Sequence, residues 1–258
     1  MIKPRHVICA LGNWTSFDPI ATTLKGIKSG FELNREYSIL QANPKISPSF
    51  KVNQDRLPST LDESDWNAIN AHTAVAYILS PPMEMETAET ISAEALKVIS
   101  SLFKCGATAI QSESAGLCHG KQRWLNLASR FVEAEKSRNM FEMGATLYKT
   151  WVQRGIVDDN VLMYTIGMHL LGHRDIECHL NDEGPERAIQ WADMLGHYIL
   201  ADRPTRDILE GDGFRLEQNS RERRIISIEK CLRRPSDSFQ YNPHGYLRLN
   251  LEDKLKLL

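Results

Sequence analysis

The sequence has no apolar run long enough to cross a membrane and no excess of charge of one sign. Its longest wholly apolar stretches, such as residues 74–79, fall far short of the ~20 residues that a membrane-spanning helix needs. Lys and Arg number 31 and Asp and Glu 33, for a net charge of −2, so composition favours neither nucleic acid nor anionic lipid as a partner. Residues 1–11 also lack the apolar core of a signal peptide. We therefore expect a cytoplasmic protein that binds no membrane and no nucleic acid.

Paired cysteines and the common catalytic motifs are missing as well. The five cysteines are odd in number and include no Cys-x-x-Cys pair, which indicates free thiols in a reducing compartment rather than a disulfide framework. The sequence has no GxxxxGK[ST] or GxGxxG phosphate loop and no GxSxG nucleophile elbow. We therefore expect a protein that is not an enzyme and needs no cofactor.

The composition is that of an ordinary globular chain, with 42% hydrophobic and 25% charged residues among 258. Continuous apolar runs at residues 6–11, 72–80 and 107–111 predict strands that are covered on both faces. The proline-rich segment 43–61 predicts an irregular connection.

Helices are predicted where apolar residues recur at steps of three and four. This spacing predicts a helix over residues 86–104, and residues 116–154 are expected to be largely helical, with Asn139 as a break. Pro185 suits the first position of another helix, over residues 185–200.

Short β-like segments dominate beyond residue 158. They lie at residues 161–170, 176–180, 214–216, 225–232 and 246–251. In the second of them, alternation directs Glu177 and His179 outward. The whole pattern predicts an α+β fold of mixed or antiparallel sheets with packed helices, its antiparallel elements concentrated after residue 158. Two lobes, 1–157 (α/β) and 158–258 (α+β), and one compact domain both fit, because no flexible linker divides the chain.

A cluster of four possible metal ligands provides an alternative function, that of a metal-dependent enzyme. On a helix, two histidines four residues apart share a face and can bind zinc. Gly172 opposes a helix here, and a strand–turn–strand arrangement would send the side chains in different directions. The four residues are His169, His173, Glu177 and His179.

Charge is distributed unevenly along the chain. No basic residue occurs between Arg56 and Lys97, a stretch that contains many acids. The C-terminal part is arginine-rich, but Glu222 and Glu229 interrupt its basic residues and no aromatic residues are interleaved, which argues against a nucleic-acid-binding module. These basic residues are Arg221, Arg223, Arg224, Lys230, Arg233 and Arg234. The acidic stretch is the better candidate for a protein-binding surface.

Four sequence segments resemble a family of uncharacterised bacterial domains. The segments are Met163-Tyr164-Thr165-Ile166-Gly167-Met168, then Leu171-Gly172-His173-Arg174-Asp175-Ile176-Glu177, the predicted helix 185–200, and Gly211-Asp212-Gly213. Proteins of this kind are encoded near polymorphic toxins and type VI secretion effectors. The resemblance implies an immunity protein, and some similar families accompany nuclease toxins.

We therefore expect an immunity protein that binds and neutralises a cognate antibacterial toxin, such as a type VI secretion nuclease effector. A nuclease presents a cationic substrate cleft, which a carboxylate-bearing surface can occupy or flank. The acidic residues before and within the helix at 86–104 lie beside two methionines that are expected to be exposed. The predicted contact residues are Met83, Glu84, Met85, Glu86 and Glu89.

Overall fold

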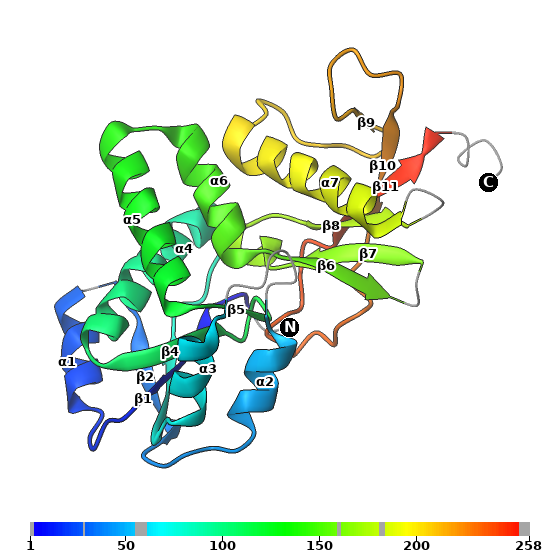
Figure 1. The fold of residues 1–258 in the computed structure, drawn as a ribbon. Coiled ribbons are helices and arrows are strands. Elements are labelled where there is room, and N and C mark those ends of the chain that lie inside the picture. The colour runs from blue at the N-terminus through cyan, green and yellow to red at the C-terminus, as the bar shows by residue number, and fades with distance from the viewer. Residues whose placement is uncertain (1–2, 28, 55–60, 159–160, 181–183, 253–258) are drawn as a thin grey trace.

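The structure, a computed structural model, describes residues 3–27, 29–54, 61–158, 161–180 and 184–252. In these ranges the chain forms seven α-helices and two β-sheets (Figure 1). The predicted α+β class is confirmed. A five-stranded antiparallel sheet has the order β2-β3-β1-β4-β5, and a six-stranded mixed sheet has the order β6-β7-β8-β11-β10-β9.

The first sheet and its helices come from the N-terminal half of the chain. Its strands are β1 (Val7–Gly12), β2 (Glu32–Ile39), β3 (Ala74–Leu79), β4 (Ala107–Ser112) and β5 (Leu117–His119). The helices are α1 (Asp18–Ile27), α2 (Ile46–Val52), α3 (Glu63–Asn70), α4 (Met85–Lys104), α5 (Lys121–Ser137) and α6 (Met140–Trp151).

The second sheet follows α6. Its strands are β6 (Gln153–Asp158), β7 (Leu162–Ile166), β8 (Asp175–His179), β9 (Gly213–Phe214), β10 (Arg224–Glu229) and β11 (Tyr246–Leu251). The 3-10 turn η1 (Met168–Leu171) separates β7 from β8, and α7 (Gly184–His197) continues into the π-helical turn η3 (Tyr198–Asp202).

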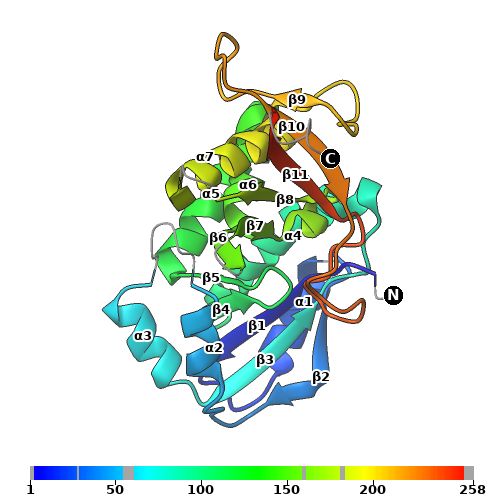
Figure 2. The same cartoon turned by 90° about the vertical axis from the view of Figure 1, so that its right-hand side faces the viewer.

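Strand β1 lies at the centre of the first sheet and is buried along its whole length, as its apolar sequence predicts. Ile8 belongs to the core that β1 forms with α1, α4 and α5, whereas Cys9 packs with α2 and α3 on the opposite face. Both β3 and β4 pair antiparallel with β1, so they run in the same direction and α4 connects them. Figure 2 shows this sheet below the second one, with α2 and α3 on its outer side.

The second sheet has one well-covered face. Helix α7 lies along it (Figure 1). Trp191 and Leu195 of α7 belong to the same core cluster as Ile176 and Leu247. This cluster also includes residues of the first sheet, so the two sheets share one continuous core. Along the chain, the second sheet begins with β6 at Gln153, a few residues before the predicted lobe boundary.

Several sequence-based expectations about secondary structure are wrong. Residues 168–170 were expected within a β-like segment but belong to the 3-10 turn η1, and residues 117–119 were expected in a largely helical stretch but form β5. The segment 43–61 contains α2, a short helix whose apolar residues Ile46 and Phe50 are buried; its residues 55–60 lie outside the described ranges. The antiparallel elements are not concentrated after residue 158, because the second sheet is the mixed one. Its β11 returns through a long connection and pairs parallel with β8, and sequence alternation carries no information about such a distant pairing.

A buried hydroxyl group joins the two halves of the fold. The ring of His6, just before β1, lies 2.7 Å through Nε2 from Ser92 Oγ on α4. The Ser92 hydroxyl donates to the carbonyl of Leu170 in η1, and the indole of Trp151 donates to the Ser92 carbonyl. Because the hydroxyl hydrogen is used for Leu170, His6 must carry its own hydrogen on Nε2.

Buried aromatic rings continue this junction. His6 packs on Trp151 with ring centroids 4.3 Å apart, Trp151 lies 5.6 Å from Trp124, and Trp124 lies 4.7 Å from His119. Burial is the largest cause that lowers the pKa of His6 and of His119 to about 3, and it lowers the pKa of His169 to about 4. These three imidazoles are therefore neutral at pH 7.

We expect acid to destabilise the protein through these three histidines. Each folded-state pKa is lower than the unfolded value of 6.5, so the unfolded chain takes up protons first and stability is lost as the pH falls below 6.5. At pH 5 the loss is about 2 kcal/mol per histidine. Urea unfolding at pH 7 and pH 5 measures it, and His119→Gln, which keeps a donor for Thr150, should lessen the difference. An unchanged free energy of unfolding at pH 5 would contradict the assignment.

Candidate functional site

The two methionines predicted to contact a partner differ in exposure. Met85, the first residue of α4, is 55% exposed. Met83 is 2% exposed, so the expectation that it lies on the surface is wrong. Its backbone N–H donates to the carbonyl of Pro4, and its side chain packs in a small core with Leu117 and Leu170.

The three predicted acids also differ. Glu84 is exposed and forms an ion pair with Lys3. Glu89 is half-buried and contacts Arg203 at 2.5 Å and His173 at 3.8 Å. Glu86 is exposed and makes no ion pair with any residue that the structure describes. Much of the predicted acidic surface is therefore neutralised within the chain.

Met85 stands between two hollows. A cleft of about 450 Å³ opens between the start of α4, the turn after η1, the segment that follows η3 and the start of β11. A second hollow of about 330 Å³ adjoins the N-terminal segment. Met85 and His244 line both of them. The larger one, here called the Met85 cleft, also brings together Glu89, His173, Arg174 and Arg203.

The turn at Gly172 sets the position of one wall of the cleft. Gly172 has a φ of 80°, a conformation that side chains disfavour. A Cβ atom at this position would lie 2.6 Å from the carbonyl oxygen of Met85. Glycine therefore permits the turn to pack directly on the first residue of α4, which places His173 and Arg174 beside Met85.

Asn242 holds the histidines on the two sides of the cleft. This buried side chain donates to the carbonyl of His173 at 3.0 Å and to Asp175 Oδ2 at 2.7 Å. Its Oδ1 accepts the backbone N–H of His244 at 2.9 Å. One amide group thus fixes both histidine backbones, so the cleft is pre-organised.

Asp175 lies beneath this arrangement and is fully buried. Burial raises its pKa to about 7, although hydrogen bonds from Asn242, the backbone of Met168 and Thr165 favour the ionised form. The raised pKa of Asp175 contributes stability to the fold. This contribution is complete below the unfolded pKa of 3.8 and is lost as the pH rises through 7. It therefore offsets part of the acid effect of the buried histidines.

Charges within the cleft are only partly balanced. Burial favours protonated Glu89, but hydrogen bonding and attraction from His173 and Arg203 outweigh it and lower the pKa of this carboxyl. The pKa of His244 is lowered by burial and then by repulsion from Arg174 and His173. The guanidinium of Arg174 forms no ion pair with the described residues, and its Nε is buried without a hydrogen-bond partner.

The four residues of the alternative metal site do not come together. His169 is buried with Nε2 3.1 Å from the carbonyl of Phe239, His173 faces Glu89, and Glu177 and His179 lie on β8. Gly167 and Gly172 divide the segment into strand, 3-10 turn and strand, which separates the side chains. Across the described ranges, no group of three or more His, Cys, Asp or Glu residues could hold a metal ion.

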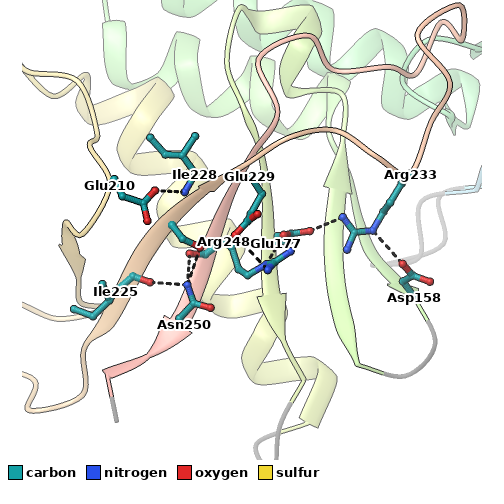
Figure 3. Close-up of polar contacts among 10 residues, drawn as sticks. Asp158, Glu177, Glu210, Ile225, Ile228, Glu229, Arg233, Arg248 and Asn250 are labelled. Atoms are coloured by element: carbon teal, nitrogen blue, oxygen red, sulfur yellow. Dashed lines mark hydrogen bonds and ion pairs between the residues drawn. The ribbon is translucent and has the colours of Figure 1, made fainter. Parts of the chain in front are cut away.

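Glu177 has a structural environment instead. It was expected to face solvent, but it is fully buried and accepts from Arg233 at 2.5 Å and Arg248 at 2.6 Å. Arg233 continues to Asp158 at 3.1 Å and Arg248 to Glu229 at 3.3 Å. Figure 3 shows these five residues as a row of alternating charges across the second sheet, here called the charge row.

Two of the arginines predicted to form a basic segment, Arg233 and Arg224, make their contacts within the fold. Arg233 also stacks over Tyr164 and Tyr246, with distances of 4.8 Å and 5.1 Å to the ring centroids. Arg224 is buried 5.2 Å from the ring of Trp191. Their partners lie far away in the sequence, so local charge patterning could not reveal these contacts.

No family model, curated protein or solved structure matches this chain. Within the described residues, no helix combines the length and the apolar character needed to cross a bilayer. The Met85 cleft is therefore a candidate site on its geometry alone.

We predict that Gly172→Ala destabilises the protein by about 3 kcal/mol, from backbone strain plus the contact with the Met85 carbonyl. Gly211→Ala is the matched control, because Gly211 has a φ of 84° but no atom lies within 4 Å of the position that a Cβ would take there. It should cost only about 1 kcal/mol. Equal losses in thermal unfolding would show that the close approach to Met85 does not matter.

We predict that Glu177→Gln costs about 3–5 kcal/mol, because it leaves two arginines without their shared buried counter-charge. Asp158→Asn, at the exposed end of the charge row, should cost less than about 1 kcal/mol. Chemical denaturation measures both. Stability that depends on added zinc or is lost with a chelator would instead support the metal alternative.

Proposed function

We propose that this chain is an immunity protein, which binds a cognate antibacterial toxin in the cytoplasm and neutralises it by protein–protein contact, without catalysis. The observation that supports the proposal is the position of Met85. An apolar side chain, 55% exposed, stands between two hollows and is flanked by Glu84 and Glu86. An apolar anchor within a polar rim is the usual arrangement of a protein-binding surface.

Methionine is well suited to this role. Its unbranched, polarisable side chain adapts to irregular partner surfaces. The backbone beneath it is held rigidly, since the turn at Gly172 packs on the Met85 carbonyl and Ser92 ties α4 to η1. A pre-organised backbone reduces the entropy lost on binding.

The acids beside Met85 favour a cationic partner surface. Glu86 has no ion pair within the described chain, and its carboxylate is exposed. Glu84 is 60% exposed and its partner Lys3 is 63% exposed, so this surface ion pair is weak and Glu84 can exchange its partner. The substrate cleft of a nuclease has the complementary charge, which supports a type VI secretion nuclease effector as the toxin.

The resemblance to bacterial immunity domains bears on the same region. Two glycines of the resembling segments, Gly167 and Gly172, bound the η1 turn and have φ values of 121° and 80°. A Cβ at Gly167 would lie 1.9 Å from the Trp151 carbonyl oxygen. These glycines are needed for the turn that packs against Met85, which supports a link between the resembling segments and the surface.

The test is co-expression with the product of the neighbouring open reading frame, which should be the toxin, together with a binding measurement on the purified pair. The wild-type protein should restore growth and co-purify with the toxin. Met85→Asp should weaken binding by at least about tenfold, the loss expected for a central anchor. Glu86→Lys should slow association several-fold by reversing an unpaired charge.

Matched controls are available elsewhere on the surface. Met140 is 47% exposed in the first turn of α6, and Glu63 occupies the first turn of α3 as Glu86 does in α4. Met140→Asp and Glu63→Lys should leave protection intact. If all four variants protect equally, the Met85 surface is wrong; if the wild type neither binds nor protects, the immunity function is wrong.

A further inference from the structure

One corner of the Met85 cleft concentrates basic groups. Arg174 and His173 enter it from the turn after η1, and His244 enters from the segment before β11. All three are half-buried. Arg174 has no ion-pair partner among the described residues, and its Nε has neither solvent contact nor a hydrogen bond.

The neighbouring charges do not neutralise this corner. Glu89 is taken by Arg203 and His173, and Arg206 is paired with Asp212 at 2.8 Å. Asp207 lines the cleft, but it is exposed and makes no ion pair with Arg174. Arg174 is thus the unbalanced cation of the cleft, in a position where an unpaired charge is costly.

We propose that this corner is an oxyanion-binding site that takes a carboxylate or phosphate group. Arg174 is its main ligand, because a guanidinium presents a planar fork of donors that matches both groups. His244 provides an additional donor, and Asn242 fixes its backbone. His173 lies beside it with Nε2 facing Glu89, and Asn242 fixes its backbone as well. The cleft, about 450 Å³, has the size of ordinary ligand sites.

Two sources can supply the oxyanion. One is an acidic side chain of the toxin, which would insert beside Met85 and fix the register of the complex; this source rests on the proposed function. The other is a small phosphorylated or carboxylated molecule, which needs no toxin. The chemistry at Arg174 is the same in both cases.

The first experiment uses the isolated full-length protein and inorganic phosphate. Phosphate titration should shift the NMR signals of the His173 and His244 rings and raise the pKa of His244. Arg174→Met should reduce phosphate affinity by about tenfold. Arg174→Lys should retain part of it, because the charge remains and the fork is lost. Arg221→Met, an exposed arginine without an ion pair in the described chain, is the matched control and should bind like the wild type.

A loss of phosphate binding by Arg174→Met would not reflect unfolding of the variant. Removal of an unpaired, half-buried charge should leave its melting temperature unchanged or raised. The proposal is overturned if phosphate leaves the His244 signal unmoved in the wild type, or if Arg174→Met binds phosphate as tightly as the wild type does.

The second arm identifies the source. If phosphate competes with the toxin and Arg174→Met weakens toxin binding, the toxin supplies the oxyanion. If phosphate binds, but neither phosphate nor the Arg174→Met substitution changes toxin binding, a small molecule is the ligand. Both outcomes support the site. Failure of the toxin to bind the wild type, with phosphate binding intact, would remove the immunity function and leave the oxyanion site standing.

Discussion

The arrangement of the two sheets depends on a buried, hydrogen-bonded junction at Ser92 within the core that the sheets share. Ser92 on α4 accepts from His6 beside the first sheet and donates to Leu170 in the turn of the second sheet. The hydroxyl accepts one hydrogen bond and donates the other, so a rotation of α4 would disturb both contacts. The first turn of α4 is thereby held against the turn at Gly172, and the Met85 cleft lies where these two turns meet.

Local patterns in the sequence predict most of the elements but not their partners. The buried strands β1, β3 and β4 and the helix α4 follow from continuous apolar runs and from helical spacing, which need only neighbouring residues. The parallel pairing of β11 with β8, and the burial of Glu177 between Arg233 and Arg248, join residues far apart in the chain. Alternation along β8 directs Glu177 to the sheet face opposite α7, and we expected that face to be open to solvent. The segment that carries Arg233 covers Glu177 on this face.

The candidate site is predictable only in part, for the same reason. The acidic segment indicates Met85 and Glu86, which are exposed, and wrongly indicates Met83, which the N-terminal segment covers. The corner at Arg174 and His244 escapes sequence reasoning, because Asn242 joins the backbones of His173 and His244, which are distant in sequence. The sequence feature that could point to this corner is Gly172, which precedes the basic residues of the turn. By itself, this glycine indicates only a turn.

Hydrogen–deuterium exchange of the protein with and without its cognate toxin tests the binding surface most directly, because it reads every backbone segment at once. We expect slower exchange in the complex at the segments around the Met85 cleft, and little change at α2 and α3 on the far side of the first sheet. The segments expected to be protected are residues 83–89, 168–174, 203–209 and 242–247. Protection confined to α2 and α3, with these four segments unchanged, would contradict this expectation.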